Sequence, residues 1–575
     1  MCGFVGGTDP SWDYAAGLKS IEHRGPDDGR LHLDSPISVG FRRLSIIDLD
    51  AGAHQPMFSD DGQSWLVFNG EIYGFLELRK ELQSRGRAFR THSDTEVVLQ
   101  AYFEWGDDFI EQIDGMFAIV IWDARETKLK LYRDRPGIKP LYYFYDGSRF
   151  AFASELKALR CAIDPADLQV DNTAVYDFLG YRYIPGPKTL YRNCFQLLPA
   201  HRLIFEPASG KLGGPQPYWT LPIPDSPREM TADEAAEELR VLIDNSVRQQ
   251  MISDVPLGFF LSGGVDSSII VASAASMTSD ISTFSIGFDS GAPSETAYAR
   301  VVADMFGTDH HERTLSREDA GELLPSMKSW FDEPYAGESA MPTYLVSKVA
   351  RENVTVVLTG DGGDEVFGGY KTYPRFERYD RMPSLPAFTE GLTHRLRALF
   401  GRNGSMARVT NLIEMALSGG PRLWGKIMSR IPEFERRRYR SQFEIPADYD
   451  DWWHYRLHWR EDLPTRTCLQ VVDFHTYMPA YVLTKVDRTS MAVSLEARVP
   501  LLDRRIIEFA FSLPEEVRFY NGEAKGLLRH AYRGVLPDRI LDRRKRGFGV
   551  PKRYLKGMTT DKTIEHQILE MHGIV

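Results

Sequence analysis

Cysteine is scarce in this 575-residue sequence, and one of the few has an unusual position. The four cysteines are Cys2, Cys161, Cys194 and Cys468, and no two of them form a CxxC pair. The sequence therefore suggests neither a disulfide framework nor a zinc site. Cys2 directly follows the first Met, where residues are usually frayed and dispensable. A thiol at this position calls for a functional explanation.

The sequence also lacks an excess of positive charge and long apolar runs. The formal net charge is -11 at pH 7, which argues against broad nucleic-acid binding because such proteins present a basic face. No stretch approaches the roughly 18 apolar residues of a membrane span, and no charged segment followed by an apolar run suggests a secretory signal. We therefore expect a cytoplasmic protein that binds neither nucleic acid nor membranes.

The pattern of apolar runs divides the chain into two parts. Residues 1–205 contain short β-like runs such as MFAIVIWD, separated by Gly, Asp and Pro turns, which predicts stacked antiparallel sheets. Residues 206–230 are rich in Gly and Pro and are predicted to be a linker. In residues 231–575, strands such as PLGFFL and VTVVLTG alternate with helical patterns. This alternation predicts an α/β domain with a parallel sheet and crossover helices.

A glycine-rich loop follows the first strand of this second part. The segment LSGGVDSSI, residues 261–269, lies between the apolar runs PLGFFL and IIVASAA, so a strand, a turn and a helix start are in sequence. Its glycines let backbone N–H groups approach an anion, and the helix N-terminus adds positive potential. The Walker A pattern GxxxxGK[ST] is absent. Asp266 is tolerable beside phosphates when a divalent cation lies between them.

A second glycine-rich loop strengthens the prediction of a nucleotide site. The segment TGDGGDEVFGGY, residues 359–370, follows the strand VTVVL and holds Asp361, Asp364 and Glu365. Two such loops at strand ends, each with an Asp, predict one Mg²⁺–nucleotide site at the carboxyl edge of a parallel sheet. The alternative, an acidic surface turn, explains only one loop at a time.

The first of these loops resembles the pyrophosphate-loop signature of the ATP-pyrophosphatase family. Those enzymes cleave ATP between the α- and β-phosphates and adenylate a carboxylate. The resemblance implies that Asp266 and Asp364 hold Mg²⁺ and that Lys525 and Lys485 stabilise negative charge on the reacting phosphates. The remaining ATP and pyrophosphate contacts that it implies are Leu261, Ser262, Gly263, Gly264, Ser267, Ser268, Ile286, Thr359, Gly360 and Asp361.

The position of Cys2 suits an N-terminal nucleophile. Aminopeptidases remove Met before a small residue, which would place the thiol next to a free α-amine. That amine has a reference pKa of about 7.7–8.0, so part of it is unprotonated at neutral pH and can act as a base. The thiolate is the reactive form of cysteine. One residue would then supply both the nucleophile and the base.

Several motifs near Cys2 resemble the glutaminase domain of class II glutamine amidotransferases. They are HRGPDDG, RRLSIID, FNGEIY, HSDTEV and DGMFAIVIWD, in this order between residues 23 and 123. The resemblance implies that Arg43 binds the α-carboxylate of glutamine, and that Glu71 and Asp94 bind its α-amine. It also implies that Asn69 and the N–H of Gly70 form the oxyanion hole.

Together the two halves resemble the glutamine-hydrolysing asparagine synthetases, from residue 2 to about residue 555. Two later motifs, SMAVSLEARVPLLD (490–503) and RKRGFGVP (544–551), add to the resemblance. It implies two domains: an N-terminal Ntn-hydrolase αββα sandwich of antiparallel sheets, and a doubly wound parallel-sheet ATP-pyrophosphatase domain with added helices. The implied substrates are glutamine, aspartate and ATP with Mg²⁺, with ammonia passing between the domains. The family also suggests a homodimer.

Three departures leave the acceptor open. Family members often have Asp and Ser where this chain has Gly337 and Glu338, and enteric-type members have Glu in place of Asp361. These positions are expected near the acceptor. The first interpretation is aspartate as acceptor, and the second is another carboxylate, such as a sugar uronate in surface-polysaccharide assembly. A third, from another class, is a regulatory or scaffold protein with inactive sites.

Overall fold

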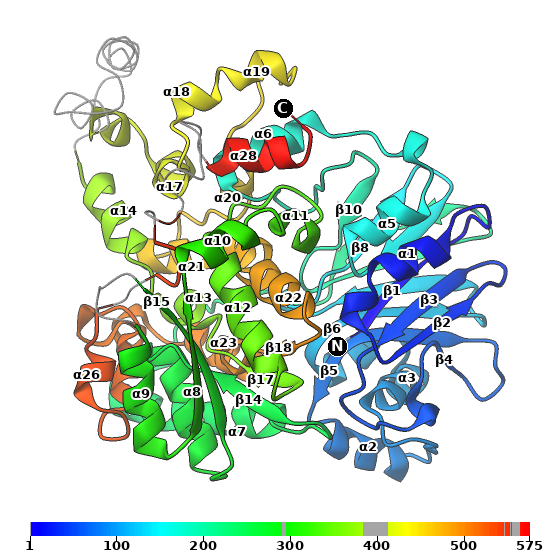
Figure 1. Cartoon of the computed structure of the whole chain (residues 1–575), viewed down its shortest axis with the longest axis horizontal. Helices are drawn as coiled ribbons and strands as arrows, with labels where there is room; N and C mark the ends of the chain where they lie inside the picture. Colours follow the sequence, from blue (N-terminus) through cyan, green and yellow to red (C-terminus); the bar gives the residue numbers. More distant parts are fainter. Residues whose placement is uncertain are drawn as a thin grey trace.

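The chain folds into two parts that lie side by side (Figure 1). A computed structural model describes residues 2–289, 295–382, 412–544, 547–551, 554 and 564–574. The N-terminal part is built on two antiparallel sheets, and the C-terminal part on one parallel sheet. The predicted two-domain α/β fold is therefore confirmed.

The N-terminal part consists of two sheets of antiparallel strands. The first has the order β10-β8-β9-β1-β3-β2, and the second has the order β12-β11-β7-β6-β5-β4, with β13 also paired to β11. The strands of the first sheet are β1 (Cys2–Gly7), β2 (Asp28–His32), β3 (Ser38–Arg43), β8 (Tyr142–Tyr145), β9 (Phe150–Ala153) and β10 (Cys194–Gln196). Those of the second are β4 (Met57–Phe58), β5 (Trp65–Tyr73), β6 (Asp114–Asp123), β7 (Lys128–Arg133), β11 (His201–Glu206), β12 (Lys211–Leu212) and β13 (Gln216–Pro217).

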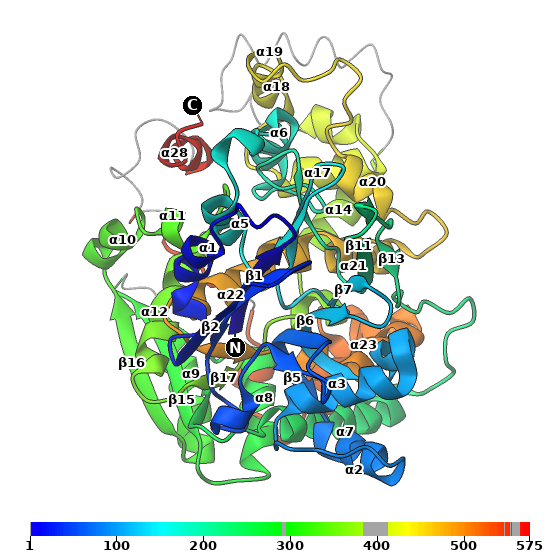
Figure 2. The same cartoon turned by 90° about the vertical axis from the view of Figure 1, so that its right-hand side faces the viewer.

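The alternation of side chains along each strand produces four layers. On β5, Trp65 and Val67 pack into the cluster between the sheets, whereas Leu66 and Phe68 pack into the cluster under the outer helices. The helices α1 (Tyr14–Ser20) and α5 (Leu156–Ala162) cover the first sheet, and α2 (Phe75–Ser84) and α3 (Asp94–Trp105) cover the second (Figure 2). The expected αββα sandwich is formed in this way.

The C-terminal part has a parallel sheet in the order β16-β15-β14-β17-β18. Val357 and Leu358 on β17 face two different hydrophobic clusters, because helices cover both faces of this sheet. The chain order reverses between β14 and β17, which makes the space at their carboxyl ends the topological switch point. The strands are β14 (Leu257–Phe260), β15 (Ser282–Phe288), β16 (Asp309–Leu315), β17 (Val356–Leu358) and β18 (Glu496–Arg498).

Helices surround this sheet and extend beyond it. The first, α7 (Ala232–Gln250), begins with a capping box in which Thr231 and Glu234 bond each other's backbone. The others near the sheet include α8 (Val265–Ala275), α9 (Glu295–Phe306), α12 (Ala340–Arg351), α13 (Gly363–Phe367), α22 (Thr484–Met491), α23 (Arg504–Ser512) and α25 (Gly526–Ala531). The added helices include α14 (Thr372–Asp380), α17 (Gly420–Met428), α20 (Trp453–Leu457), α21 (Thr465–His475) and α28 (Ile564–Met571).

Two details qualify the sequence interpretation. The predicted linker 206–230 contains β12 and β13, which pair with β11, so the second N-terminal sheet extends to Pro217. The motif at 544–551 is described except for Lys545 and Arg546, which lie outside the described residues. Among the helices of the described ranges, none has the length and apolar character needed to cross a membrane.

Candidate active sites

The pairing of β1 with β3 sets the first site. In this antiparallel register Cys2 lies opposite Arg43. The backbone N–H of Cys2 donates a hydrogen bond of 3.0 Å to the side-chain oxygen of Asn69, which stands on β5 in the facing sheet. The predicted nucleophile, carboxylate-binding arginine and oxyanion-hole asparagine therefore lie together where the two sheets meet.

Asn69 holds an amide donor that no described residue uses. Its Oδ1 accepts from Cys2, and its Nδ2 is buried without a hydrogen-bond partner in the described part of the chain. Next to it, a Cβ on Gly70 would lie 1.9 Å from the carbonyl oxygen of Met116, so only glycine fits here. An oxyanion hole requires a buried hydrogen-bond donor without a partner close to the nucleophilic residue, and Asn69 Nδ2 meets this requirement.

Two buried acids accompany these groups. Burial, together with the neighbouring carboxylates Glu496 and Asp94, raises the pKa of Glu71 well above its usual value. Burial raises the pKa of Asp94 to about 6, although its Oδ2 accepts a 3.1 Å hydrogen bond from the N–H of Ile72. Bringing an ammonium group between these acids would relieve the cost of their burial.

The thiol of Cys2 needs a base. Burial raises its pKa above the usual value, and the positive amino terminus opposes this only in part. The thiol is therefore protonated at neutral pH, and a proton acceptor has to come from a group next to it. The α-amine of Cys2 itself would be such a group once Met1 is removed.

The C-terminal part also contributes to this site, which the sequence interpretation missed. Glu496 and Arg498 on β18 are buried, and the guanidinium Nη2 of Arg498 lies 3.4 Å from Glu71 Oε1. Arg498 also bonds Glu496 at 2.7 Å. Charged residues at alternate positions of the short buried strand EAR were the signal that could have identified them.

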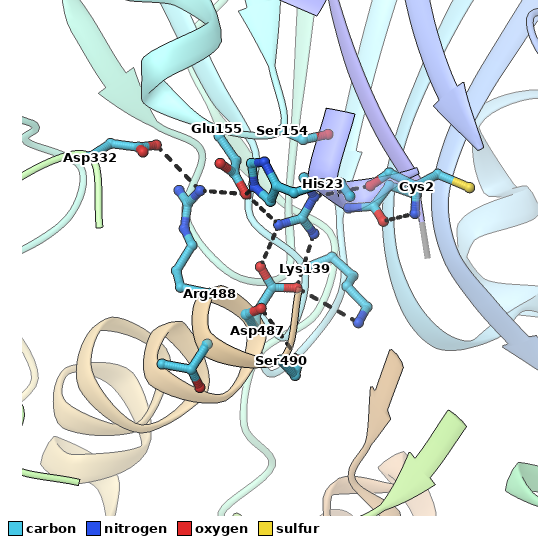
Figure 3. Close-up of polar contacts among 12 residues, drawn as sticks. Cys2, His23, Lys139, Ser154, Glu155, Asp332, Asp487, Arg488 and Ser490 are labelled. Atoms are coloured by element: carbon cyan, nitrogen blue, oxygen red, sulfur yellow. Dashed lines mark hydrogen bonds and ion pairs between the residues drawn. The ribbon is translucent and has the colours of Figure 1, made fainter. Parts of the chain in front are cut away.

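A buried network of charges connects Cys2 to helix α22 (Figure 3). Arg24 donates from Nε to the carbonyl oxygen of Cys2 at 3.0 Å, and from Nη1 to Glu155 at 2.7 Å. Its guanidinium also bonds both carboxylate oxygens of Asp487, at 2.8 and 3.0 Å. Arg488, the next residue on α22, pairs with Glu155 at 2.9 Å. The network therefore joins the nucleophile's strand to the C-terminal part.

The second site is a cavity of about 590 Å³ that is lined by residues following β14 and β17, at the switch point of the parallel sheet. Most residues that the resemblance assigned to ATP and pyrophosphate line it. They are Leu261, Ser262, Gly264, Asp266, Ser267, Ile286, Thr359, Gly360, Asp361, Asp364, Lys485 and Lys525.

Two of the predicted residues, Gly263 and Ser268, do not line the cavity. Ser268 is fully buried in the first turn of α8. Gly263 has a φ of +65°, and a Cβ there would lie 2.5 Å from the backbone N of Ala299. The glycine is therefore needed for the close approach of the loop to α9.

The two glycine-rich loops touch because they lack side chains at the contact. A Cβ on Gly360 would lie 2.6 Å from the backbone N of Ser267. A Cβ on Gly363 would lie 2.8 Å from Asp266 Oδ1. Side chains at either glycine would separate the loops. The contact brings the two aspartates of the loops, Asp266 and Asp364, to one place.

A lysine lies between these aspartates. The ammonium of Lys525 forms ion pairs with Asp266 and with Asp364, the latter at 2.6 Å. Although burial opposes it, the two carboxylates raise the pKa of Lys525 above its usual value. Lys525 has a φ of +57° just before α25, a strained conformation of the kind found at functional sites. Lys485 similarly pairs with Asp361 at 3.1 Å.

The donor set suits a magnesium ion that arrives with a nucleotide. Among the described residues, no group of three or more His, Cys, Asp or Glu side chains could hold a metal by itself. Mg²⁺ is commonly bound by one or two carboxylates together with substrate phosphates. Asp266 and Asp364, which both face the cavity, meet that requirement.

Comparison with known proteins agrees with this geometry. The asparagine synthase family model matches residues 238–571, more than half of the chain. The chain belongs to the asparagine synthase family. A glutamine amidotransferase domain model matches residues 1–219.

Similar members of the asparagine synthase family extend over nearly the whole chain. The Bacillus subtilis protein named asparagine synthetase [glutamine-hydrolyzing] 1 is 35% identical over 96% of this chain and 88% of its own length. The putative asparagine synthetase [glutamine-hydrolyzing] 2 of Methanocaldococcus jannaschii is 35% identical over 82% of this chain and 94% of its own. A putative asparagine synthetase of Mycobacterium bovis is 33% identical over 95% of this chain and 85% of its own.

Two of the three departures named from the sequence lie at the cavity of the asparagine synthase part. Asp361 and Glu338 both line it. Glu338 forms a two-pronged ion pair with Arg430, which also lines the cavity. A Cβ on Gly337 would lie 2.2 Å from the ring of Tyr335, so the glycine follows from local packing. The differences at Glu338 and Asp361 therefore lie in the wall of this cavity.

Proposed function

We propose that this chain makes asparagine from aspartate, glutamine and ATP, with glutamate, AMP and pyrophosphate as the other products. The observation that carries the proposal is the presence of two complementary sites in one chain. Cys2 lies beside an idle amide donor of Asn69. A separate cavity at a topological switch point holds carboxylates bridged by Lys525. The first site suits amide hydrolysis, and the second suits activation of a carboxylate.

In the first reaction, the Cys2 sulfur attacks the side-chain amide carbon of glutamine. The carbon–nitrogen bond breaks, the nitrogen takes up the thiol proton through the α-amine of Cys2, and ammonia leaves. Asn69 Nδ2 and the N–H of Gly70 stabilise the oxyanion. Arg43 binds the α-carboxylate, and Glu71 and Asp94 bind the α-ammonium. Water then hydrolyses the glutamyl thioester and releases glutamate.

In the second reaction, an oxygen of the aspartate β-carboxylate attacks the α-phosphorus of ATP. The bond between the α-phosphorus and the bridging oxygen breaks, and pyrophosphate leaves with the electron pair. Ser262, Ser267 and the N-terminus of α8 bind the departing phosphates. Lys525 stabilises the charge that develops on them. Mg²⁺, which Asp266 and Asp364 would hold, supplies further neutralising charge.

In the third reaction, ammonia attacks the β-acyl carbon of the adenylate, a proton is lost, and AMP leaves. Ammonia is a nucleophile only when it is neutral, and water at pH 7 would protonate most of it. We therefore propose a shielded passage between the two sites. The division into a glutaminase domain and a synthetase domain, a cytoplasmic location and a homodimer are further proposals that the family resemblance supports.

A pyrophosphate-release assay with glutamine and Mg-ATP tests this proposal. Aspartate, glutamate, a sugar uronate and no acceptor are compared, and AMP and ADP are measured separately. The expected result is pyrophosphate and AMP in equal amounts with aspartate. Pyrophosphate release with the uronate and none with aspartate would identify the uronate, and not aspartate, as the acceptor. ADP as product, or no release with any carboxylate, would contradict the proposal as a whole.

A further inference from the structure

An arginine of the N-terminal part reaches into the nucleotide cavity. Arg182 directly follows α6 (Asn172–Tyr181), within the segment that matches the glutamine amidotransferase domain, yet it lines the cavity together with Lys485 and Asp361. Its φ of +75° lies in the left-handed region, which is unfavourable for a residue with a Cβ. The packing therefore holds this residue in a specific orientation.

The guanidinium of Arg182 is fixed mainly by neutral acceptors. Its Nη2 donates hydrogen bonds of 2.7 Å to the carbonyl oxygen of Ala336 and to the hydroxyl of Tyr481. Its Nε is buried and bonds no described residue, and a carboxylate oxygen of Glu565 lies 3.9 Å away. The side chain is only 11% exposed. Because its ion pair with Glu565 spans 3.9 Å, this buried guanidinium can still take a closer anionic ligand.

Most other cations of the cavity are directly engaged with carboxylates. Arg529 lies one helical turn after Lys525 on α25, so it is near the residues that we propose to bind the phosphates. Arg182 differs from these other cations, since among the described residues it has no carboxylate oxygen within hydrogen-bond distance. The engaged pairs are Lys485 with Asp361, Lys525 with Asp266 and Asp364, Arg430 with Glu338, and Arg543 with Glu295.

A row of side chains connects Arg182 with the residues that we propose to bind the phosphates. Three side chains at every fourth residue line the cavity: Tyr477 just before the π-helical segment η5 (Met478–Leu483), Tyr481 within it and Lys485 on α22. Such π-helical turns are frequent at functional sites. Tyr481 bonds Arg182 and Lys485 bonds Asp361, so one continuous helical stretch connects Arg182 to the acidic loop after β17.

We propose that Arg182 binds the acceptor carboxylate that is not adenylated, which makes the acceptor a small dicarboxylate. Arginine pairs with a carboxylate through two parallel hydrogen bonds, which fixes orientation as well as charge. In aspartate the bound group is the α-carboxylate, while the β-carboxylate faces the nucleotide. A sugar uronate has a single carboxylate and lacks this second anchor. This inference rests on the proposed function and assigns its acceptor subsite.

The test compares aspartate with β-alanine, which keeps the carboxylate to be activated and lacks the other. Pyrophosphate release is driven by added ammonia, so that Cys2 is not required. The wild type is expected to prefer aspartate in kcat/KM. Arg182→Met should reduce that preference at least about tenfold, the effect of losing a charge-assisted hydrogen bond. Arg182→Lys should keep part of the preference, and the KM for Mg-ATP and glutamine hydrolysis should stay unchanged.

Tyr481→Phe is the matched control for a purely structural role of Arg182. It removes one hydrogen bond of the guanidinium but keeps the cation, so the preference for aspartate should persist. An unchanged preference in both Arg182 variants would overturn the assignment while aspartate-dependent release by the wild type still supports the proposed function. If the wild type releases no pyrophosphate with any dicarboxylate, both proposals fail.

Discussion

Arg24 and Asp487 form a buried ion pair although 463 positions separate them in the chain. The guanidinium donates hydrogen bonds of 2.8 and 3.0 Å to the two carboxylate oxygens, and both side chains are buried. Arg24 also bonds the carbonyl oxygen of Cys2, whereas Asp487 belongs to the helix that carries Lys485. One pair therefore connects the elements that position the two sites.

Asp487→Asn tests how much this ion pair contributes to stability and to glutamine hydrolysis. The change leaves a buried guanidinium with less neutralisation, so the free energy of unfolding should fall by about 3–5 kcal/mol. Glutaminase kcat/KM should fall as well, because Arg24 supports the backbone of Cys2. Urea denaturation at pH 7 and a glutamate-release assay measure the two effects. Glu81→Ala, which removes an exposed pair with Arg85, should cost no more than about 1 kcal/mol. Equal losses in the two variants would contradict the prediction.

Cys2→Ala should separate the two reactions. Without the sulfur no thioester forms, so glutamine hydrolysis and glutamine-dependent synthesis should disappear. Synthesis from added ammonia should remain near the wild-type rate, because the nucleotide cavity is unchanged. Cys161→Ala is the matched control, since Cys161 is an exposed cysteine and should be dispensable. Glutamate release by the Cys2 variant at the wild-type rate would rule out this nucleophile.

The pKa of Asp94 predicts a pH dependence of glutamine binding. Burial raises this pKa to about 6, so the carboxyl is ionised above that pH and neutral below it. Only the ionised form attracts the ammonium group of glutamine. The dissociation constant, measured by calorimetry on the Cys2→Ala variant, should therefore rise about tenfold between pH 7 and pH 5. With Asp94→Asn added, binding should be weak and its pH dependence smaller, because only Glu71 is left to titrate against the ammonium group. A flat profile with Asp94 intact would refute the assignment.

Lys525→Met should affect the chemical step more than nucleotide binding. The ammonium stabilises charge on the phosphates in the transition state, and losing one such group costs about 2.7–4 kcal/mol in other enzymes. We therefore expect pyrophosphate release to fall by about two to three orders of magnitude in kcat, with a smaller change in the KM for Mg-ATP. Lys80→Met, at an exposed position of the N-terminal part, is the control. A kcat that stays within threefold would exclude the role.

Local patterns in the sequence predicted the stacked sheets and the parallel-sheet part, whereas the family resemblance supplied most of the candidate site residues. Short β-like runs separated by turn residues predicted stacked antiparallel sheets, and in the structure Leu66 and Val67 face different layers. The two glycine-rich loops with Asp266 and Asp364 predicted one shared site, and the structure adds that the loops touch, because side chains at Gly360 and Gly363 would keep them apart. These features depend on neighbours in the chain or on backbone conformation, which the sequence expresses directly.

Residues that act across the boundary between the two parts were not predictable in this way. Arg182, Arg498 and the pair of Arg24 with Asp487 acquire their partners only when the parts dock. No spacing in the sequence encodes such contacts. The strands β12 and β13 escaped detection for another reason, since they span two residues each within a segment rich in Gly and Pro.

The most direct test of the account follows labelled atoms through one turnover. Aspartate with ¹⁸O in its β-carboxylate and glutamine with ¹⁵N in its side-chain amide are supplied with Mg-ATP, and the products are analysed by mass spectrometry. The account predicts asparagine that carries ¹⁵N and AMP that carries one ¹⁸O. Formation of ADP, AMP without ¹⁸O, or asparagine without ¹⁵N would contradict it.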